Sequence, residues 1–263
     1  MNLSFFTHGG GSGKIRGEQI ATYLGAKLNP TSRFENDICI YVKCVPPRNY
    51  PKHSYVDVVE DSAGLRWVKS NPDIGIIASS KSIYDYLSNK LLANRIVFIP
   101  QHHCNFERVL RTRKEVKIAG IIGNNVSFQY PLGELEAGLN RIGIELKTLI
   151  KKRFDSREEV VDFYKQIDIQ LVWRPGSNGV LRNPLKLINA MSFGIPTVAW
   201  PEKDFVEELE GCFIEASSIE LFLTYVQELQ RDNDLYKTIY NLGLERSKYY
   251  HIDNISKLYL KLE

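Results

Sequence analysis

Residues 183–199 read NPLKLINAMSFGIPTVA and combine the signals of a helix with those of the strand that follows it. Asn183 is a natural N-cap, and Pro184 is favoured at the first helical position. A glycine and a proline then end the helix, which we expect over 184–193. The β-branched and apolar residues over 197–200 are typical of a buried strand.

The same alternation of strand and helix patterns extends outward over nearly the whole chain. The expected strands cover residues 2–7, 37–42, 55–59, 73–78, 95–100, 116–122, 146–150, 167–173, 197–200 and 212–215. Continuously apolar strands that alternate with helices form parallel sheets covered on both faces. The sequence therefore predicts an α/β fold made of two doubly wound, Rossmann-like domains.

The stretch with the weakest periodicity, residues 105–115, marks the expected boundary between the two domains. We place an N-terminal domain at 1–110 and a C-terminal domain with closing helices at 111–263. The basic cluster in this stretch fits a solvated linker better than a binding patch; it comprises Arg108, Arg111, Arg113 and Lys114.

Composition excludes several classes of protein. The chain has 263 residues, is 43% hydrophobic and carries a net charge of +3, so it can bury real cores and has no nucleic-acid or membrane signature in its total charge. Its four cysteines have no metal-ligand spacing, which predicts free thiols, a reducing compartment and no metal site. No apolar run approaches the ~20 residues that span a bilayer. We expect a cytoplasmic protein.

A second informative stretch, HGGGSGKIRG at residues 8–17, directly follows the first predicted strand. It departs from the nucleotide-binding P-loop, because His8 replaces the first glycine and Ile15 replaces the hydroxyl residue that holds magnesium. A strand, a glycine-rich turn and a helix nevertheless present bare backbone N–H groups at the carboxyl edge of a sheet. We expect a ligand-facing, phosphate-contacting loop formed by Gly10, Gly11, Ser12, Gly13 and Lys14.

Lys186 lies in the first turn of the helix predicted over 184–193. A cation is disfavoured at a helix N-terminus unless an anion shares the site. Asn189 follows three residues later and is therefore expected on the same helical face. The pair predicts an anion site, and the alternative is that both are ordinary surface residues.

The segment 183–199 resembles the nucleotide-sugar-binding motif of glycosyltransferases with the GT-B fold, in particular the retaining glycosyltransferase family 4. The resemblance rests on Pro184, Lys186, Leu187, Ala190, Met191, Gly194, Pro196, Val198 and Ala199. It implies two Rossmann-like domains that face a cleft, with a nucleotide-diphosphate sugar donor held by the C-terminal domain and an acceptor by the N-terminal domain. It also implies sugar transfer with retention and without a bound metal or cofactor.

By the same resemblance, Lys186 contacts the donor diphosphate and Asn189 occupies the place of a ribose-binding glutamate. The other donor-binding residues expected in the loop before the helix are Trp173, Arg174, Arg182 and Asn183. The sequence departs from the family at three points: Leu181 replaces a sugar-binding glutamate, the neutral Asn189 replaces a second glutamate, and residues 120–125 lack the family's two phosphate-binding cations. These departures favour the alternative, a catalytically inactive relative that binds a nucleotide, a sugar or a partner protein.

Candidate catalytic residues lie in the N-terminal half. His8 and His102 each follow a predicted strand, where a histidine could orient a sugar hydroxyl or accept its proton. Arg16 could reach the phosphates from the glycine-rich stretch. The acceptor stays open between a polysaccharide, a lipid-linked sugar, a protein and modified DNA.

Overall fold

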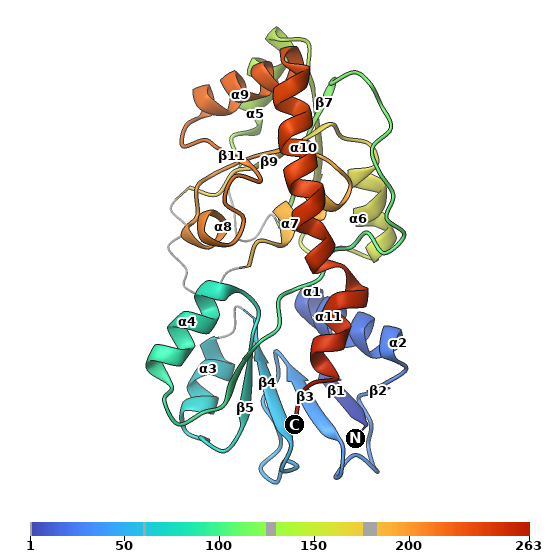
Figure 1. The fold of residues 1–263 in the computed structure, drawn as a ribbon, viewed down its shortest axis with the longest axis vertical. Coiled ribbons are helices and arrows are strands. Elements are labelled where there is room, and N and C mark those ends of the chain that lie inside the picture. The colour runs from blue at the N-terminus through green and yellow to red at the C-terminus, as the bar shows by residue number, and fades with distance from the viewer. Residues whose placement is uncertain (1, 60–61, 125–129, 176–182) are drawn as a thin grey trace. The chain divides into compact units, whose positions relative to one another are not determined.

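Two all-parallel sheets organise the protein, as the alternating pattern predicts. A computed structural model describes residues 2–59, 62–124, 130–175 and 183–263 (Figure 1). These residues form two compact units: the first contains 2–102, Asn183 and 252–263, and the second contains 103–175 and 184–251.

The first sheet has the strand order β2-β1-β3-β4-β5-β6. Its strands are β1 (Leu3–Thr7), β2 (Lys27–Leu28), β3 (Ile38–Val42), β4 (Ser54–Val58), β5 (Gly75–Ala78) and β6 (Ile96–Phe98). The helical elements of this unit are α1 (Gly10–Ser12), the π-helix η1 (Gly13–Gln19), α2 (Ile20–Leu24), α3 (Ser62–Lys69), α4 (Lys81–Lys90) and α11 (Ile252–Tyr259). Sequence periodicity missed β2, because a two-residue strand has no period.

The second sheet has the order β11-β10-β9-β7-β8. Its strands are β7 (Ile118–Gly123), β8 (Glu145–Ile150), β9 (Ile169–Val172), β10 (Thr197–Ala199) and β11 (Ile214–Glu215). Its helices are α5 (Leu132–Arg141), α6 (Arg157–Tyr164), α7 (Leu185–Ser192), α8 (Lys203–Glu208), α9 (Ile219–Arg231), α10 (Asn233–Ser247) and the short 3-10 helix η2 (Lys248–Tyr250). Every strand of this sheet was predicted, while α8 was not.

Side-chain and backbone caps set the starts of α6 and α7. Ser156 Oγ accepts a hydrogen bond from the Glu159 backbone N–H at 3.3 Å and thereby caps α6. Helix α7 begins at Leu185, and Pro184 rather than Asn183 occupies its N-cap position. The backbone of Pro184 (φ −81°, ψ 27°) departs from helical geometry, so the helix starts one residue later than predicted.

The division of the chain corrects the predicted domain boundary. Asn105 Nδ2 donates to the carbonyl of Ser192 at 2.8 Å, and residues 103–110 belong to the second unit. At the other end, α11 returns to the first unit, where it lies beside α2 (Figure 1). Its Tyr259 ring packs on Phe5 with centroids 5.5 Å apart, which places residues 252–263 in the first unit instead of the second.

The basic stretch over 105–115 is not the solvated linker that the sequence predicts. Arg111 Nε lies 2.7 Å from Asp168 Oδ1, and the Arg111 side chain is only 8% exposed. Arg113 Nε lies 2.9 Å from the same oxygen. A buried carboxylate thus holds this stretch against the second sheet, which sequence periodicity cannot reveal because the two partners lie far apart in the chain.

A buried ion pair lies in the interior of the first unit. Arg16 is 1% exposed, its Nε is 2.7 Å from Asp57 Oδ2, and its Nη2 donates to the Ile99 carbonyl at 2.8 Å. Tyr259 Oη donates to the same Asp57 oxygen at 3.4 Å. Burial alone would lower the pKa of the Arg16 guanidinium, but the adjacent Asp57 carboxylate raises it, so Arg16 stays protonated. The pair joins η1, β4 and α11.

We predict that Asp57→Asn destabilises the protein by about 3–5 kcal/mol, because it leaves the Arg16 charge buried without a counter-charge. The double variant Arg16→Met/Asp57→Asn should regain part of that loss. Urea unfolding of the wild type, both single variants and the double variant measures the coupling. A double variant whose loss equals the sum of the two single losses would show that the pair is not coupled.

Candidate functional site

The second sheet has a point where successive strands are added on opposite sides. Strand β7 lies between β8 and β9, so the chain passes to one side of β7 and then returns to the other. In open parallel sheets, ligands bind outside the carboxyl ends of the strands at such a point. Here Gly123 ends β7, and Trp173 and Arg174 follow β9.

Gly123 provides a close approach to bare backbone at this edge. A Cβ atom at Gly123 would lie 2.0 Å from Tyr130 Oη and 3.0 Å from Lys186 Nζ. Lys186 Nζ itself lies 3.4 Å from Tyr130 Oη and 5.9 Å from the centre of that ring. An ammonium group and a phenol hydroxyl therefore converge on the end of β7, and only glycine leaves room for them.

Lys186 supplies a cation at the end of β7, where the sequence itself has no basic residue. Residues 120–125 have no basic side chain, but Lys186 reaches the end of β7 from the first turn of α7. Tyr130 is the functional candidate that sequence reasoning missed, since one tyrosine after a strand carries no motif. Burial raises the pKa of Tyr130, an effect that the charge of Arg174 opposes. The phenol is therefore neutral and can donate a hydrogen bond.

Arg174 follows β9 but is already engaged. Its Nε lies 2.9 Å from Glu202 Oε1, and the two side chains are 7% and 5% exposed. Its guanidinium also lies 5.6 Å from the centre of the Phe205 ring. The positive charge that the sequence predicts at this edge is thus present, with Glu202 as a counter-charge that sequence reasoning did not anticipate.

The remaining predicted donor-binding residues are Trp173, Arg182 and Asn183, and the first and last of these differ in burial. Trp173 is half-buried and packs edge-on against Trp200, with ring centroids 5.3 Å apart. Asn183 is buried. Arg182 lies outside the described residues.

Asn189 does not share the exposed side of α7 with Lys186, contrary to the prediction. It is 5% exposed, and its Oδ1 accepts a hydrogen bond from the Cys104 backbone N–H at 2.8 Å. Residues three apart on a helix differ by about 60° in direction, which is enough here for one side chain to face the sheet edge and the other the interior. The expected ribose-binding role does not fit this position.

The glycine-rich stretch of the first unit is helical rather than a turn. The helical segment begins at Gly10 and continues through η1 and α2. Gly9 (φ 79°, ψ −156°) and Gly10 (φ 81°) adopt backbone conformations that favour glycine. A Cβ atom at Gly9, Gly10 or Gly11 would meet nothing within 4 Å, so their backbone faces open space.

Gly13 and Gly17, later in the same stretch, lie close to the side chain of Thr7. A Cβ atom at Gly13 would lie 2.2 Å from Thr7 Oγ1, and one at Gly17 would lie 3.2 Å from Thr7 Cγ2. These two positions let the helix pack closely on β1. Ser12 and Lys14 are half-buried. Of the predicted ligand-facing residues, Gly10 and Gly11 are therefore open, whereas Gly13 packs on β1.

The three predicted catalytic residues have different environments. His8 is exposed. His102 is 1% exposed, and its Nε2 lies 2.9 Å from the carbonyl of Ile15. Arg16 is buried against Asp57. His102 and Arg16 thus support the glycine-rich stretch from the interior, and the expectation that they face a substrate does not agree with their burial.

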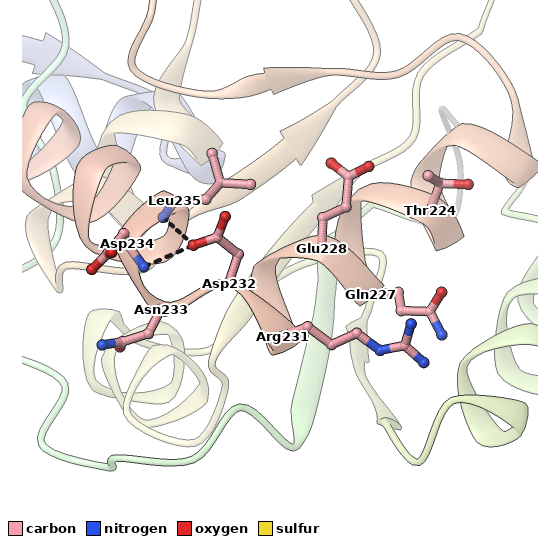
Figure 2. Close-up of a pocket in the computed structure, with 8 residues that line it drawn as sticks. All are labelled: Thr224, Gln227, Glu228, Arg231, Asp232, Asn233, Asp234 and Leu235. Atoms are coloured by element: carbon pink, nitrogen blue, oxygen red, sulfur yellow. Dashed lines mark hydrogen bonds between the residues drawn. The ribbon is translucent and has the colours of Figure 1, made fainter.

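A separate pocket of about 710 Å³ lies where α9 meets α10. Figure 2 shows its carboxylates, and the Asp232 side chain caps α10 by accepting hydrogen bonds from the backbone N–H groups of Asp234 and Leu235, both at 2.9 Å. Glu228, Asp232 and Asp234 give this pocket a negative lining. It is therefore unsuited to a diphosphate.

No helix among the described residues is long and apolar enough to cross a membrane. Within the same residues, no group of three or more His, Cys, Asp or Glu side chains could hold a metal ion.

Solved structures share this fold over the whole chain. Sucrose-phosphate synthase from Thermosynechococcus elongatus matches with a TM-score of 0.66 at 11% identity, over 100% of this chain and 99% of its own. Anabaena HepE in complex with UDP and glucose gives 0.63 at 11% identity, over 99% and 98%. The lipopolysaccharide outer core galactosyltransferase WaaB gives 0.57 at 12% identity, over 100% and 99%.

The chain has the GT-B glycosyltransferase fold. Its sequence matches no protein-family model and no curated protein sequence. The fold class predicted from the alternating pattern is thereby confirmed, while membership of glycosyltransferase family 4 stays a prediction.

We predict that Gly123→Ala destabilises the protein by about 1–3 kcal/mol, because the added methyl group overlaps Tyr130 Oη. Tyr130→Phe in the same chain should relieve most of that cost. The matched control is Gly133→Ala, where a Cβ atom meets nothing within 4 Å. Thermal unfolding compares the variants, and an unchanged melting temperature for Gly123→Ala would contradict the close approach.

We further predict opposite effects for two neighbouring glycines. Gly9→Ala should cost about 1–3 kcal/mol, because its backbone conformation is reserved for glycine. Gly11→Ala should be neutral or stabilise by up to about 1 kcal/mol, since Gly11 lies in a helix and its Cβ position is open. Chemical denaturation measures both, and equal losses would argue against the backbone described for this stretch.

Proposed function

We propose that this protein transfers a sugar from a nucleotide-diphosphate sugar to an acceptor hydroxyl without a metal ion. The observation that carries the proposal is the convergence of Lys186 and Tyr130 on Gly123, at the carboxyl edge of the second sheet. The proposal is also supported by the likeness of residues 183–199 to a nucleotide-sugar motif and by a fold shared with HepE, which was solved with UDP and glucose.

The roles of the residues follow from their chemistry. When the bond between the sugar and the diphosphate breaks, negative charge develops on the leaving phosphate. The Lys186 ammonium stabilises that charge, and the neutral Tyr130 hydroxyl donates a hydrogen bond to a phosphate oxygen. Gly123 lets the phosphate approach the main chain. Arg174, whose charge Glu202 balances, adds a fixed dipole at the same edge.

Within the first unit, we assign substrate contact to the open glycines. The exposed backbone at Gly9, Gly10 and Gly11 can approach a sugar or phosphate closely. His8 is the exposed candidate for orienting or deprotonating the acceptor hydroxyl. We assign retention of the anomeric configuration on the likeness to glycosyltransferase family 4, and NMR of the product anomer tests that assignment.

A second candidate function is donor binding without turnover. It is favoured by the burial of Arg16, His102 and Asn189, since these three predicted site residues are 1%, 1% and 5% exposed. The same experiment separates it from transfer, because an inactive relative binds the donor but releases no nucleoside diphosphate.

We predict that a nucleoside diphosphate, with UDP tested first, stabilises the protein without metal. At 100 times its dissociation constant, the ligand should add about 2.7 kcal/mol to the free energy of unfolding. Each kcal/mol should raise the melting temperature by about 2–4 °C. Lys186→Ala should abolish the shift, and Lys165→Ala, which changes an exposed lysine elsewhere, should keep it.

Transfer itself is measured by release of nucleoside diphosphate from a panel of nucleotide sugars and acceptors. Stabilisation and release together support the transferase, and stabilisation without release supports the inactive relative. A shift with Mg-ATP but with no nucleotide sugar would overturn both candidates.

A further inference from the structure

The amino edge of the second sheet carries a basic pocket of about 910 Å³. The basic pocket is lined by residues just before β7, by the C-terminal end of α9 and by the first turns of α10. Its charged lining residues are Arg111, Arg113, Lys114, Glu115, Lys117 and Lys237. A volume of this size suits a small molecule rather than a single ion.

The charge of the basic pocket is opposite to that of its surroundings. The second unit contains more acidic than basic residues, yet five of the six charged residues that line the pocket are cations. Glu115 is ion-paired with Lys117, and Asp168 is shared between Arg111 and Arg113. Positive charge is therefore in excess within the pocket, and grouped cations repel one another unless an anion joins them.

Two lysines account for most of the excess positive charge. Lys114 and Lys237 are exposed, and neither has an ion-pair partner among the described residues. They belong to different elements, one in the segment before β7 and the other in α10. Side chains of this length can close on a ligand from both sides.

Arg113 provides an unsatisfied donor at the same place. Its Nε lies 2.9 Å from Asp168 Oδ1, while its Nη2 is buried and has no hydrogen-bond acceptor among the described residues. A buried guanidinium donor without an acceptor is costly, and native proteins rarely leave one unexplained. An anion in the basic pocket would supply the missing acceptor.

The floor of the basic pocket is fixed in position. The Arg111 guanidinium lies 5.1 Å from the centre of the Tyr236 ring, and Tyr236 Oη donates to the Asp168 carbonyl at 2.8 Å. Arg111 and Tyr236 are nearly buried. Tyr236 and Asp168 thus hold the Arg111 guanidinium in place before a ligand binds, which lowers the entropy lost on binding.

We propose that the basic pocket binds a phosphate group, carried either by a soluble phosphorylated molecule or by an anionic lipid headgroup. It is a site separate from the one at Lys186. The pocket lies at the start of β7, and Gly123 ends that six-residue strand, so the two edges are about 20 Å apart.

The test uses pyrophosphate as the soluble probe, titrated by calorimetry at about 0.1 M salt, where the Debye length is about 10 Å. All proteins carry Lys186→Ala, so that the candidate donor site does not contribute. We expect Lys114→Glu/Lys237→Glu to weaken binding about tenfold or more, since a charge-assisted hydrogen bond contributes enough for such a factor. Both lysines are exposed, so the variant should fold, and circular dichroism verifies that it does.

A charge-matched control reverses two lysines outside the basic pocket. Lys165→Glu/Lys248→Glu changes the net charge equally, at side chains that are 45% and 67% exposed. It should change the dissociation constant less than about twofold, because neither lysine lines the basic pocket and salt screens the longer-range effect of exposed charges. Equal weakening by both double variants would overturn the proposal, as it would show only a general effect of net charge.

A second arm identifies where the phosphate comes from. Flotation compares phosphatidylcholine vesicles with vesicles that also contain phosphatidic acid. Binding to the acidic vesicles that Lys114→Glu/Lys237→Glu removes indicates a lipid headgroup, and binding of pyrophosphate alone indicates a soluble ligand. The proposal is overturned if neither probe binds, or if the Lys114→Glu/Lys237→Glu reversal leaves binding unchanged.

Discussion

The carboxylate of Asp168 is the contact on which the second unit most depends. Its Oδ1 accepts hydrogen bonds from the side chains of Arg111 and Arg113, and its Oδ2 accepts from the backbone N–H groups of Lys117 and Ile118, both at 2.9 Å. One buried charge therefore fixes the start of β7 beside the start of β9. Because β7 and β9 flank the point where the sheet reverses its order, Asp168 also sets the geometry of the opposite edge.

The two edges of this sheet differ in how far their positive charges are balanced by negative ones. At the carboxyl edge, Lys186 approaches bare backbone at Gly123, while Arg174 is balanced by Glu202. At the amino edge, cations outnumber their counter-charges. The first arrangement can stabilise an anion whose charge increases during a reaction, because only part of the local charge is neutralised beforehand. The second can bind an anion whose charge stays constant.

Much of the fold could be predicted because strands and helices have different local periods. The strands β7, β8 and β9 were expected within one or two residues, since each is a continuous apolar or β-branched run. Strand β2 could not be predicted, because it has two residues and no period. The sequence predicts closing helices but not that α11 belongs to the first unit, because its Tyr259 contacts Asp57 across about two hundred residues of chain. Distance along the chain hides such contacts from any local pattern.

The sequence by itself determined the α/β class, the helix after residue 184 and the presence of Lys186 in its first turn, because propensity, capping and spacing are local properties. Only the tertiary structure decided which polar residues are available to a ligand. Arg16 and Asn189 share their stretches with exposed glycines and with Lys186, yet both are buried, because Asp57 and the Cys104 backbone approach them from other elements. The spacing of residues predicts that a side chain belongs to a helix. Whether other elements bury that side chain depends on tertiary packing.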